Sequence, residues 1–337
     1  MQRLAALFAL AAFGLLILIS FNSRGPKMAE EARISFQIAT GPSGGTPFTV
    51  GQTIAGLISH PPGVGRCDVS TVCGPAGVIL SARTSQGPIE SLTAVNNGLV
   101  DSALVQADMV EAAVAGKGPF RRPGPQRHVR TIAALFPEAM HLVAANKAQV
   151  GRVSDLVGKR IYLGPAQSGS ALMARDILAA FGVGPNAFRR VESDDPAADM
   201  AAGKLDAFFV LAAPAFPAVT AALAGGKAHL LPIDGEAAVR LLADDSQLAE
   251  AHIAANLYPV SGEVVTLSTR AVWVVNERAS DALVYGLTRA LFNPANQAAL
   301  AASHPAAGAI DVATAAQSLP APLHSGAARY YREVGKL

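Results

Sequence analysis

Residues 33–59, RISFQIATGPSGGTPFTVGQTIAGLIS, are organised as a strand, a glycine-rich turn and a helix. Ile34, Phe36 and Ile38 alternate with polar residues, as in a half-buried strand. Three glycines and one proline then occupy 40–46, and apolar residues recur at helical spacing after them. Because the first amides of a helix lack partners within it, and the helix dipole adds positive charge there, this stretch predicts a site for an anion.

The same order of elements recurs later in the chain. A strand is predicted at 160–163, a turn rich in glycine and serine at 164–170, and a helix after it. Two strand ends in between carry hydrogen-bonding side chains, at 84–86 and 106–108. Ligands of open parallel sheets bind beyond the carboxyl ends of the strands. We therefore expect all these junctions on one rim, with the two glycine turns facing each other across one cleft.

Composition limits the class of protein. The chain has 337 residues, of which 51% are apolar and 15% are charged, and its formal net charge is +2. This length is sufficient for two domains with their own cores. The near-neutral charge argues against nucleic acid as a partner, because phosphate backbones are bound by strongly basic faces. Short strands that alternate with helices predict an α/β fold.

The first residues predict export. Arg3 precedes an unbroken apolar run over 4–19, so residues 1–21 are expected to be a signal peptide or a membrane anchor, followed by a polar spacer over 22–32. The run is not followed by an obvious small-residue cleavage site, and both alternatives stay open. Either one places the body of the protein outside the cytoplasm, in the periplasm, with a tether to the inner membrane if the segment is uncleaved.

The two cysteines fit an oxidising compartment. Cys67 and Cys73 lie close together in a turn-rich segment, which predicts a disulfide that contributes about 2 kcal/mol. Two sulfurs do not complete a metal site by themselves. We expect no metal, and nothing in the sequence predicts a cofactor.

Two segments are expected to connect the domains. Strands are predicted at 131–135 and 141–145, on either side of residues 136–138, and the β-prone run 264–275 is expected to return the chain to the first domain. The predicted division is lobe I from 33–140 and 268–337, and lobe II from 141–267.

Other classes of function also have candidate residues. Gly41 to Gly45 match the G-x-S-x-G pattern of serine hydrolases, with Ser43 as nucleophile and His324 as the best late histidine. No histidine follows an obvious acid at a strand end, so this is the alternative rather than the main hypothesis. A third class is a surface protein without a ligand. Tyr258, before Pro259, is interpreted equally well as a wall of the cleft and as ordinary packing.

Several segments together resemble a known family. They are IATG (38–41) with GGT (44–46), ALVQAD (103–108), ALFPE (134–138) with HLV (141–143), DLVGKR (155–160) with Gly164 and SGS (168–170), and LPAPLH (319–324) through RYY (329–331). With these motifs the chain beyond residue 33 resembles the TAXI family of TRAP-transporter solute receptors. The sequence departs from the family pattern at Pro47, Phe48, Gln86 and Pro88, which removes or moves hydrogen-bond donors.

The resemblance implies a two-lobed, type II-like periplasmic-binding-protein clamshell with a central ligand cleft. It also implies a small anionic solute such as a carboxylate, delivery to the permease subunits of an ion-driven TRAP transporter, and no catalysis. We expect the receptor to be monomeric. The residues expected to bind ligand, from the turns and from the resemblance, are Ser43, Gly45, Thr46, Phe48, Ser85, Gln86, Gln106, Asp108, Ser168, Gly169, Ser170 and Tyr258.

Overall fold

The structure is a computed structural model that describes residues 33–62, 73–259 and 262–337. The described strands form one continuous mixed sheet in the order β2-β1-β3-β10-β4-β7-β5-β6, with β8 paired to β4 and β9 paired to β10. The strands are β1 (Ile34–Ala39), β2 (Val78–Arg83), β3 (Ser102–Gln106), β4 (Val129–Ala145), β5 (Arg160–Tyr162), β6 (Arg189–Arg190), β7 (Ala207–Ala212), β8 (Ala228–Leu230), β9 (Ala249–Ile253) and β10 (Val264–Asn276). The α-helices are α2 (Thr46–Ile58), α3 (Pro88–Asn96), α4 (Ala107–Ala115), α5 (Gly169–Ala180), α6 (Pro196–Ala201), α7 (Pro217–Leu223), α8 (Gly235–Asp244), α9 (Asp281–Leu291), α10 (Pro294–Ser303) and α11 (Ser325–Glu333). Short 3-10 helices cover Gly118–Arg121, Asn146–Ala148, Val153–Leu156 and Pro305–Ala309.

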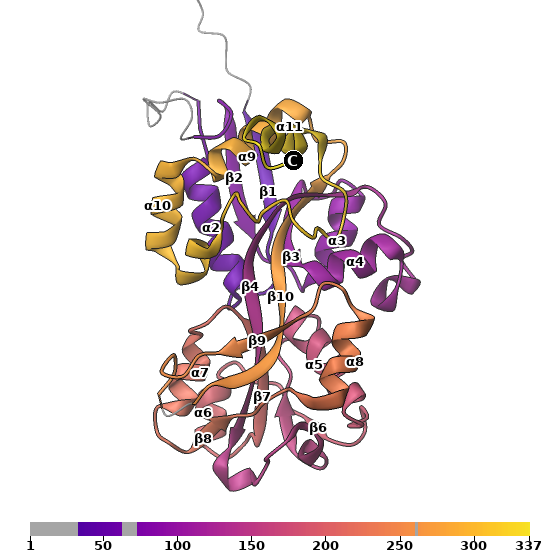
Figure 1. Cartoon of the computed structure of the whole chain (residues 1–337), viewed down its shortest axis with the longest axis vertical. Coiled ribbons are helices and arrows are strands. Elements are labelled where there is room, and N and C mark those ends of the chain that lie inside the picture. Colours follow the sequence, from indigo (N-terminus) through magenta and orange to yellow (C-terminus); the bar gives the residue numbers. More distant parts are fainter. Residues whose placement is uncertain (1–32, 63–72, 260–261) are drawn as a thin grey trace, which may run out of the picture.

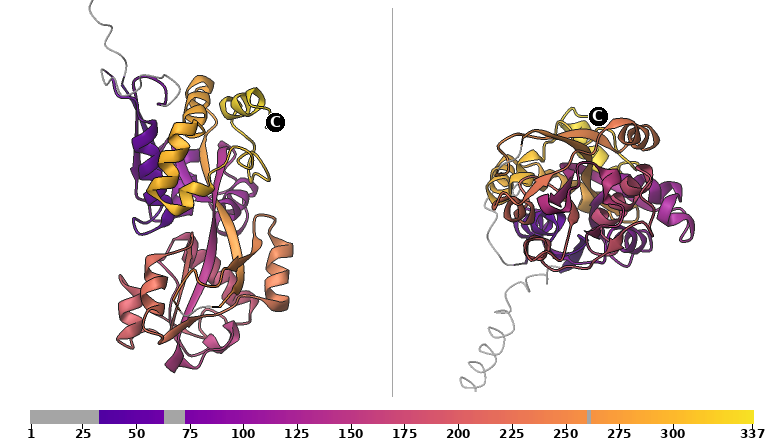
Figure 2. Two further views of the ribbon diagram at one scale, coloured as in Figure 1. Left: turned by 60° about the vertical axis from the view of Figure 1, so that its left-hand side comes forward. Right: turned by 90° about the horizontal axis from the view of Figure 1, so that it is seen from below.

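Figure 1 shows two lobes that are joined by the long strands β4 and β10. Lobe I, the upper half in the figure, holds β1 to β3 with α2 to α4 and α9 to α11, and lobe II holds β5 to β9 with α5 to α8. Helices cover the sheet from both sides in each lobe (Figure 2). The C-terminal helix α11 lies on lobe I beside α9, so the chain ends in the lobe where the described part begins.

The two long strands differ from the prediction in one respect. Residues 129–145 form a single strand of 17 residues, whereas two strands separated at Pro137 were predicted. Pro137 lies opposite Arg270 of β10, next to a register shift between Ala271 and Val272. A proline lacks an amide hydrogen but is tolerated beside such an irregularity, so the ladder continues past it. The β-prone run predicted at 264–275 is confirmed as β10.

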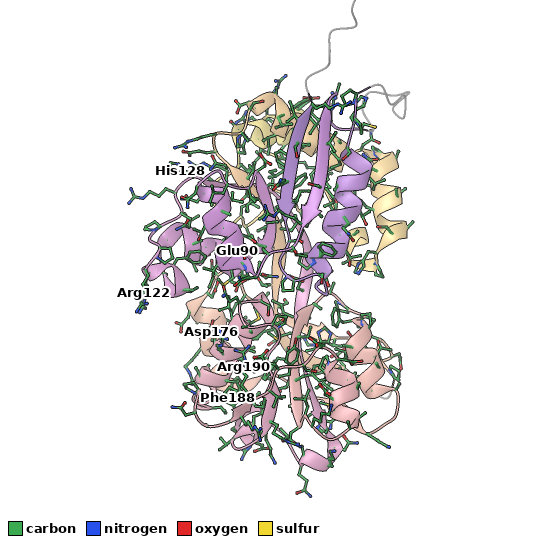
Figure 3. The ribbon with its side chains drawn as sticks, turned by 180° about the vertical axis from the view of Figure 1, so that it is seen from behind. Glu90, Arg122, His128, Asp176, Phe188 and Arg190 are labelled. Carbon is green, nitrogen blue, oxygen red and sulfur yellow. The ribbon has the colours of Figure 1, made fainter. Side chains whose placement is uncertain are left out.

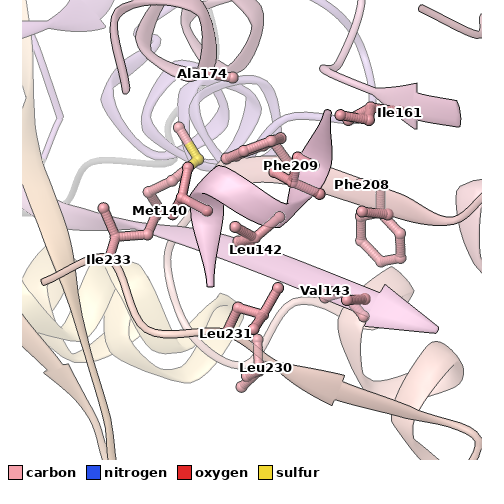
Figure 4. Close-up of a cluster of buried hydrophobic side chains, with 14 of the residues drawn as sticks. Met140, Leu142, Val143, Ile161, Ala174, Phe208, Phe209, Leu230, Leu231 and Ile233 are labelled. Atoms are coloured by element: carbon pink, nitrogen blue, oxygen red, sulfur yellow. The ribbon is translucent and has the colours of Figure 1, made fainter. Parts of the chain in front are cut away.

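The apolar residues of these strands are buried on both faces. In lobe I, Trp273 and Val275 pack in one hydrophobic cluster with Phe36, while Val272 and Val274 belong to a second cluster across the sheet. This explains the unbroken apolar character of β10, since strands covered on both faces do not alternate. Lobe II has its own core around β4 and β7, in which the labelled side chains of Figure 4 pack together.

Some predictions fall on residues that the structure does not describe. The signal or anchor segment 1–21 and the spacer 22–32 lie outside the described ranges. The same is true of Cys67, while Cys73 is buried, so the disulfide stays a prediction that non-reducing mass mapping would test. Within the described residues, no helix has the length and apolar character needed to cross a membrane. The predicted division at 140/141 and 267/268 falls inside β4 and β10, and we keep it as a proposal.

Candidate ligand-binding site

A cavity of about 520 Å³ lies between the two lobes. Its lining includes the first glycine turn, 40–45 after β1 in lobe I, and the second glycine turn, 164–170 after β5 in lobe II. The lining also includes residues of β3, β4, β5 and β7 and of the segments 87–88, 192–196 and 216–218. The volume is within the usual range for pockets that bind small molecules, roughly 300–1,000 Å³.

Helices α2 to α5 begin at this cavity, and Phe216, the residue before α7, lines it as well. The residues that precede α2, α3, α4 and α5 all line it, and these are Gly45, Gly87, Gln106 and Ser168. Only Ser168 caps its own helix with a side chain, among these four described positions. Each N-terminus carries amide hydrogens without partners in its helix and part of the positive end of the helix dipole. The cavity is therefore polarised to favour negative charge on a bound molecule.

The first glycine turn is held by the loop that follows β2. Ser85 Oγ accepts a hydrogen bond from the Gly41 amide at 3.1 Å, and the Ser85 amide donates to the Gly41 carbonyl at 3.0 Å. Gly41 has a φ of 81°, which favours glycine. Within the turn, Ser43 and Gly44 are exposed, so little packing restrains the residues at this edge of the cavity.

The second glycine turn is held by its own residues and by lobe II. Ser168 Oγ accepts from the Ala171 amide at 3.2 Å and donates to the Pro165 carbonyl at 2.8 Å. Ser170 Oγ accepts from the Leu211 amide of β7 at 2.9 Å. A Cβ on Gly164, whose φ is 97°, would lie only 2.8 Å from Ser170 Cβ. The turn thus depends on glycine for both its conformation and its packing.

The lobes touch at the edge of the cavity. Gln167 Nε2 donates to Gln86 Oε1 at 2.7 Å, and the Ala213 amide donates to Thr46 Oγ1 at 3.3 Å. A Cβ on Gly87 would lie 1.9 Å from the Gln167 carbonyl oxygen, so the backbones of the lobes meet there without room for a side chain. The structure therefore has the lobes closed over the cavity.

Glu138 of β4 is a fully buried acid that lines the cavity. Its Oε2 accepts from Gln106 Nε2 at 2.8 Å, and its Oε1, also buried, has no hydrogen-bond partner among the described residues. Burial raises the pKa of Glu138 to about 7; the bond from Gln106 opposes this shift and the nearby Asp108 adds to it. Glu138 belongs to the segment 134–138 that resembles the family, but the sequence did not predict it as a ligand-binding residue.

The charged side chains of the lining are all acidic. Besides Glu138 they are Glu192 and Asp194, which are exposed, and the described part of the lining contains no lysine, arginine or histidine. Two arginines support the second turn from outside: Arg190 Nη2 donates to the Gly164 carbonyl at 3.5 Å, and Arg175 Nη2 donates to the Ala166 carbonyl at 2.9 Å. Figure 3 shows Arg190 and Asp176 in lobe II, below Glu90 of lobe I.

The structure brings half of the expected ligand-binding residues to the cavity. Ser43, Gly45, Gln106, Ser168, Gly169 and Ser170 line it. Thr46, Phe48, Ser85, Gln86, Asp108 and Tyr258 are outside the lining.

The residues outside the lining have other contacts. Ser85 holds the first turn, while Thr46 and Gln86 bond to lobe II. Asp108 Oδ1 accepts from Thr269 Oγ1 at 3.0 Å, so its carboxylate is directed toward β10 rather than the cavity. Tyr258 is buried, and its hydroxyl accepts from the Phe216 amide at 2.9 Å and lies 2.8 Å from His141 Nε2. Of the two interpretations of Tyr258, packing agrees with this placement.

Hydrolysis at Ser43 finds no support in this geometry. No histidine is present in the described lining around Ser43. His324 caps α11 through a bond to the Gly326 amide at 3.1 Å, and its other ring nitrogen is 3.0 Å from the Ala279 carbonyl. A nucleophilic serine needs a base within hydrogen-bond reach. Among the described residues there is also no group of three or more histidine, cysteine, aspartate and glutamate side chains arranged to hold a metal ion.

Comparisons with known proteins agree with this architecture. The sequence model of the NMT1-like family matches residues 38–335. A Xanthomonas citri protein solved with bound ATP has a TM-score of 0.51 at 11% identity, over 89% of this chain and 99% of that chain. A protein of Bordetella bronchiseptica RB50 has a TM-score of 0.50 at 14% identity, over 90% and 98%. The periplasmic aliphatic sulphonate binding protein SsuA from Escherichia coli has a TM-score of 0.42 at 15% identity, over 89% and 79%. The first two share the fold of this chain, which confirms the predicted α/β class.

Proposed function

The chain belongs to the NMT1-like family, and we propose that it is an extracytoplasmic solute-binding receptor that captures a small carboxylate between its lobes. One observation carries this proposal: the N-termini of four helices converge on a single cavity between two lobes. Backbone amides bind a carboxylate with little reorganisation, and each charge-assisted hydrogen bond contributes about 1.5–3 kcal/mol.

The partner and the location follow from the sequence. The motifs that resemble the TAXI family support delivery of the solute to a TRAP-type permease, and the apolar run at 4–19 supports export to the periplasm. We propose no catalytic step, since the described lining around Ser43 contains no histidine to act as its base.

A thermal-shift and calorimetry screen tests this function. Small mono- and dicarboxylates, amino acids and sulfonates are added to the purified protein, and a carboxylate should raise the unfolding temperature in a saturable manner, because a ligand bound only to the folded state stabilises it. Gly169→Ala should weaken the shift, because the new Cβ would lie 2.6 Å from Gln106 Oε1 and displace that side chain from its place in the lining.

Gly56→Ala is the matched control. Gly56 lies in the last turn of α2, where an added Cβ has no neighbour within 4 Å among the described residues, and the variant should bind like the unmodified protein. If no carboxylate produces a shift at concentrations up to the millimolar range, the proposed function is wrong.

A further inference from the structure

We propose that the basic loop of lobe I, residues 116–127, is a docking surface for an acidic protein surface on the membrane permease. This inference rests on the proposed function, and it specifies which face of the receptor meets the permease and with which charge. The loop follows α4 and carries four exposed basic side chains, which are Lys117, Arg121, Arg122 and Arg127. Figure 3 shows Arg122 at the outer edge of lobe I.

The first argument is that these charges are unpaired. None of the four side chains has an ion pair or a hydrogen bond with another described residue, and the loop itself contains no acid. The acids on α3, on α4 and directly after β10 have other partners, which are the Gln86 amide for Glu90, Thr269 for Asp108, Ser246 for Glu111, and His128 with Arg130 for Glu277. The positive charges of the loop are therefore available to another molecule.

The second argument is that the loop has a fixed shape. Phe120 is fully buried in a hydrophobic cluster of lobe I, and the Gln126 amide donates to the Ala113 carbonyl of α4 at 2.8 Å. A Cβ on Gly116 would lie 2.8 Å from Pro125 Cγ, so the two ends of the loop are packed together. Charges held in place in this way lose little conformational entropy on binding, which suits a partner whose acids are also fixed in position.

The third argument is the chemistry of the exposed groups. Three of the four cations are arginines, whose planar guanidinium groups pair with carboxylates through two parallel hydrogen bonds. Segments that bind anionic membranes usually add exposed large apolar side chains that enter the lipid. The one large apolar side chain of this loop, Phe120, is buried, and its exposed residues are basic residues, glycine and proline. The loop therefore favours carboxylates of a protein over lipid headgroups.

The basic loop is also separate from the ligand cavity. The described lining of the cavity contains none of its residues, and α4 begins at the cavity and ends at the loop. Substitutions in the loop should therefore change docking without changing the affinity for the solute. Charges at the surface of a complex act mainly on the rate of encounter, so docking should also weaken as the salt concentration rises.

The experiment compares two triple variants that change the net charge equally. The loop variant is Arg121→Glu/Arg122→Glu/Arg127→Glu. The control variant reverses three exposed arginines on other elements and is Arg189→Glu/Arg240→Glu/Arg332→Glu. Each is produced in cells from which the gene has been deleted, and uptake of the solute identified in the screen is measured. The loop variant should lower uptake at least about tenfold, with its solute affinity by calorimetry unchanged within about twofold, while the control variant keeps both.

A second measurement identifies the chemistry of the partner. The probes are poly-L-glutamate, which presents carboxylates, and vesicles of phosphatidylglycerol and phosphatidylethanolamine, which present lipid phosphates. At low salt, about 20 mM NaCl, the unmodified protein and the control variant should prefer poly-L-glutamate to the vesicles, and this binding should weaken at about 150 mM. The loop variant should bind poly-L-glutamate at least about tenfold more weakly than either of them.

Normal uptake by the loop variant, or equal losses in the two triple variants, overturns the docking surface and leaves the solute receptor intact. A preference for the vesicles that the loop variant loses assigns the loop to the membrane and also overturns the proposal. If no carboxylate binds the unmodified protein, the proposed function itself fails. Unfolding temperatures show whether the variants are folded. If the reversed loop does not fold, the neutral variant Arg121→Gln/Arg122→Gln/Arg127→Gln replaces it, and uptake should fall by a smaller factor.

Discussion

The two glycine turns have similar sequences but are built differently. The first turn, 40–45, is attached to a neighbouring loop through Ser85, and the helix after it begins at Gly45 without a side-chain cap. The second turn, 164–170, is closed by Ser168 and Ser170 and is supported from outside by Arg175. The second turn is thus held by its own serine side chains, whereas the first depends on a serine of a neighbouring loop.

This difference suggests that the turns have different tasks. The conformation of the second turn is fixed by bonds within lobe II, and the position of the first turn depends on the loop of lobe I that carries Ser85. Closure brings the second turn against the loop after β2, where the backbones of Gly87 and Gln167 meet. In a receptor of this kind, affinity depends on closure and stability depends on how each turn is held, so the two properties should respond to different substitutions.

The largest expected effect is on closure. Gly87→Ala places a Cβ 1.9 Å from the carbonyl oxygen of Gln167, and because that atom belongs to the backbone it cannot move aside cheaply. Affinity for the solute identified in the screen should fall at least about 100-fold, or roughly 3 kcal/mol, since the closed state is excluded. Calorimetry measures the change directly.

Gly98→Ala is the control that separates the effect of blocked closure on affinity from the effect of a strained backbone. Gly98 also has a positive φ, 70°, but nothing described lies within 4 Å of an added Cβ there. It should lose some stability and keep its affinity. Equal affinities for Gly87→Ala and Gly98→Ala would mean that the contact between Gly87 and Gln167 is irrelevant to binding.

The second-largest expected effect is the pH dependence of stability that arises from Glu138, the acid near the second turn. The pKa of Glu138 is about 7 in the folded protein, above its ordinary value of 4.5, so the folded state binds more protons between these pH values. Its free energy of unfolding therefore falls as the pH rises through this window. Glu138→Gln does not titrate, and the stability of this variant relative to the unmodified protein should increase by roughly 2 kcal/mol between pH 4.5 and 7.5.

Urea unfolding of the ligand-free proteins at both pH values measures this difference. Asp108, whose pKa burial also raises to about 7, titrates in both proteins and contributes similarly to each. Glu236→Gln, on the surface of α8, should show no such change. A stability difference for Glu138→Gln that is the same at both pH values would mean that the acid titrates normally.

The turns were predictable and Glu138 was not, for a physical reason. Glycine, proline and serine specify turns through local backbone conformation, so the turns at 40–46 and 164–170 are visible in the sequence. The burial of Glu138 depends on pairing of β4 with β10 and β7, whose residues are far away in the chain. A glutamate after Pro137 gives no local sign that it will be enclosed.

Asp108 is the opposite case, because it was predicted as a ligand-binding residue but lies outside the lining of the cavity. Its place at the end of β3 predicted a ligand-binding acid, because polar groups at such strand ends generally face the ligand. The partner that directs its carboxylate elsewhere is Thr269, which is 161 residues away. The alternation of strands and helices was sufficient to predict the fold class. The directions of the side chains at the rim depend on contacts between residues that are this far apart in the sequence.

The smallest expected effect is the most direct test of the difference between the turns. Ser168→Ala removes the side-chain cap of α5, and we expect the free energy of unfolding to fall by about 1 kcal/mol. Ser43 is exposed in the first turn, so Ser43→Ala should change stability by less than about 0.5 kcal/mol. Ser43→Ala should instead weaken solute binding by about fivefold, the value of one hydrogen bond to the ligand. Chemical unfolding measures the loss of stability in each variant, and calorimetry measures the loss of affinity. Equal losses of stability would show that the two turns are stabilised in the same way.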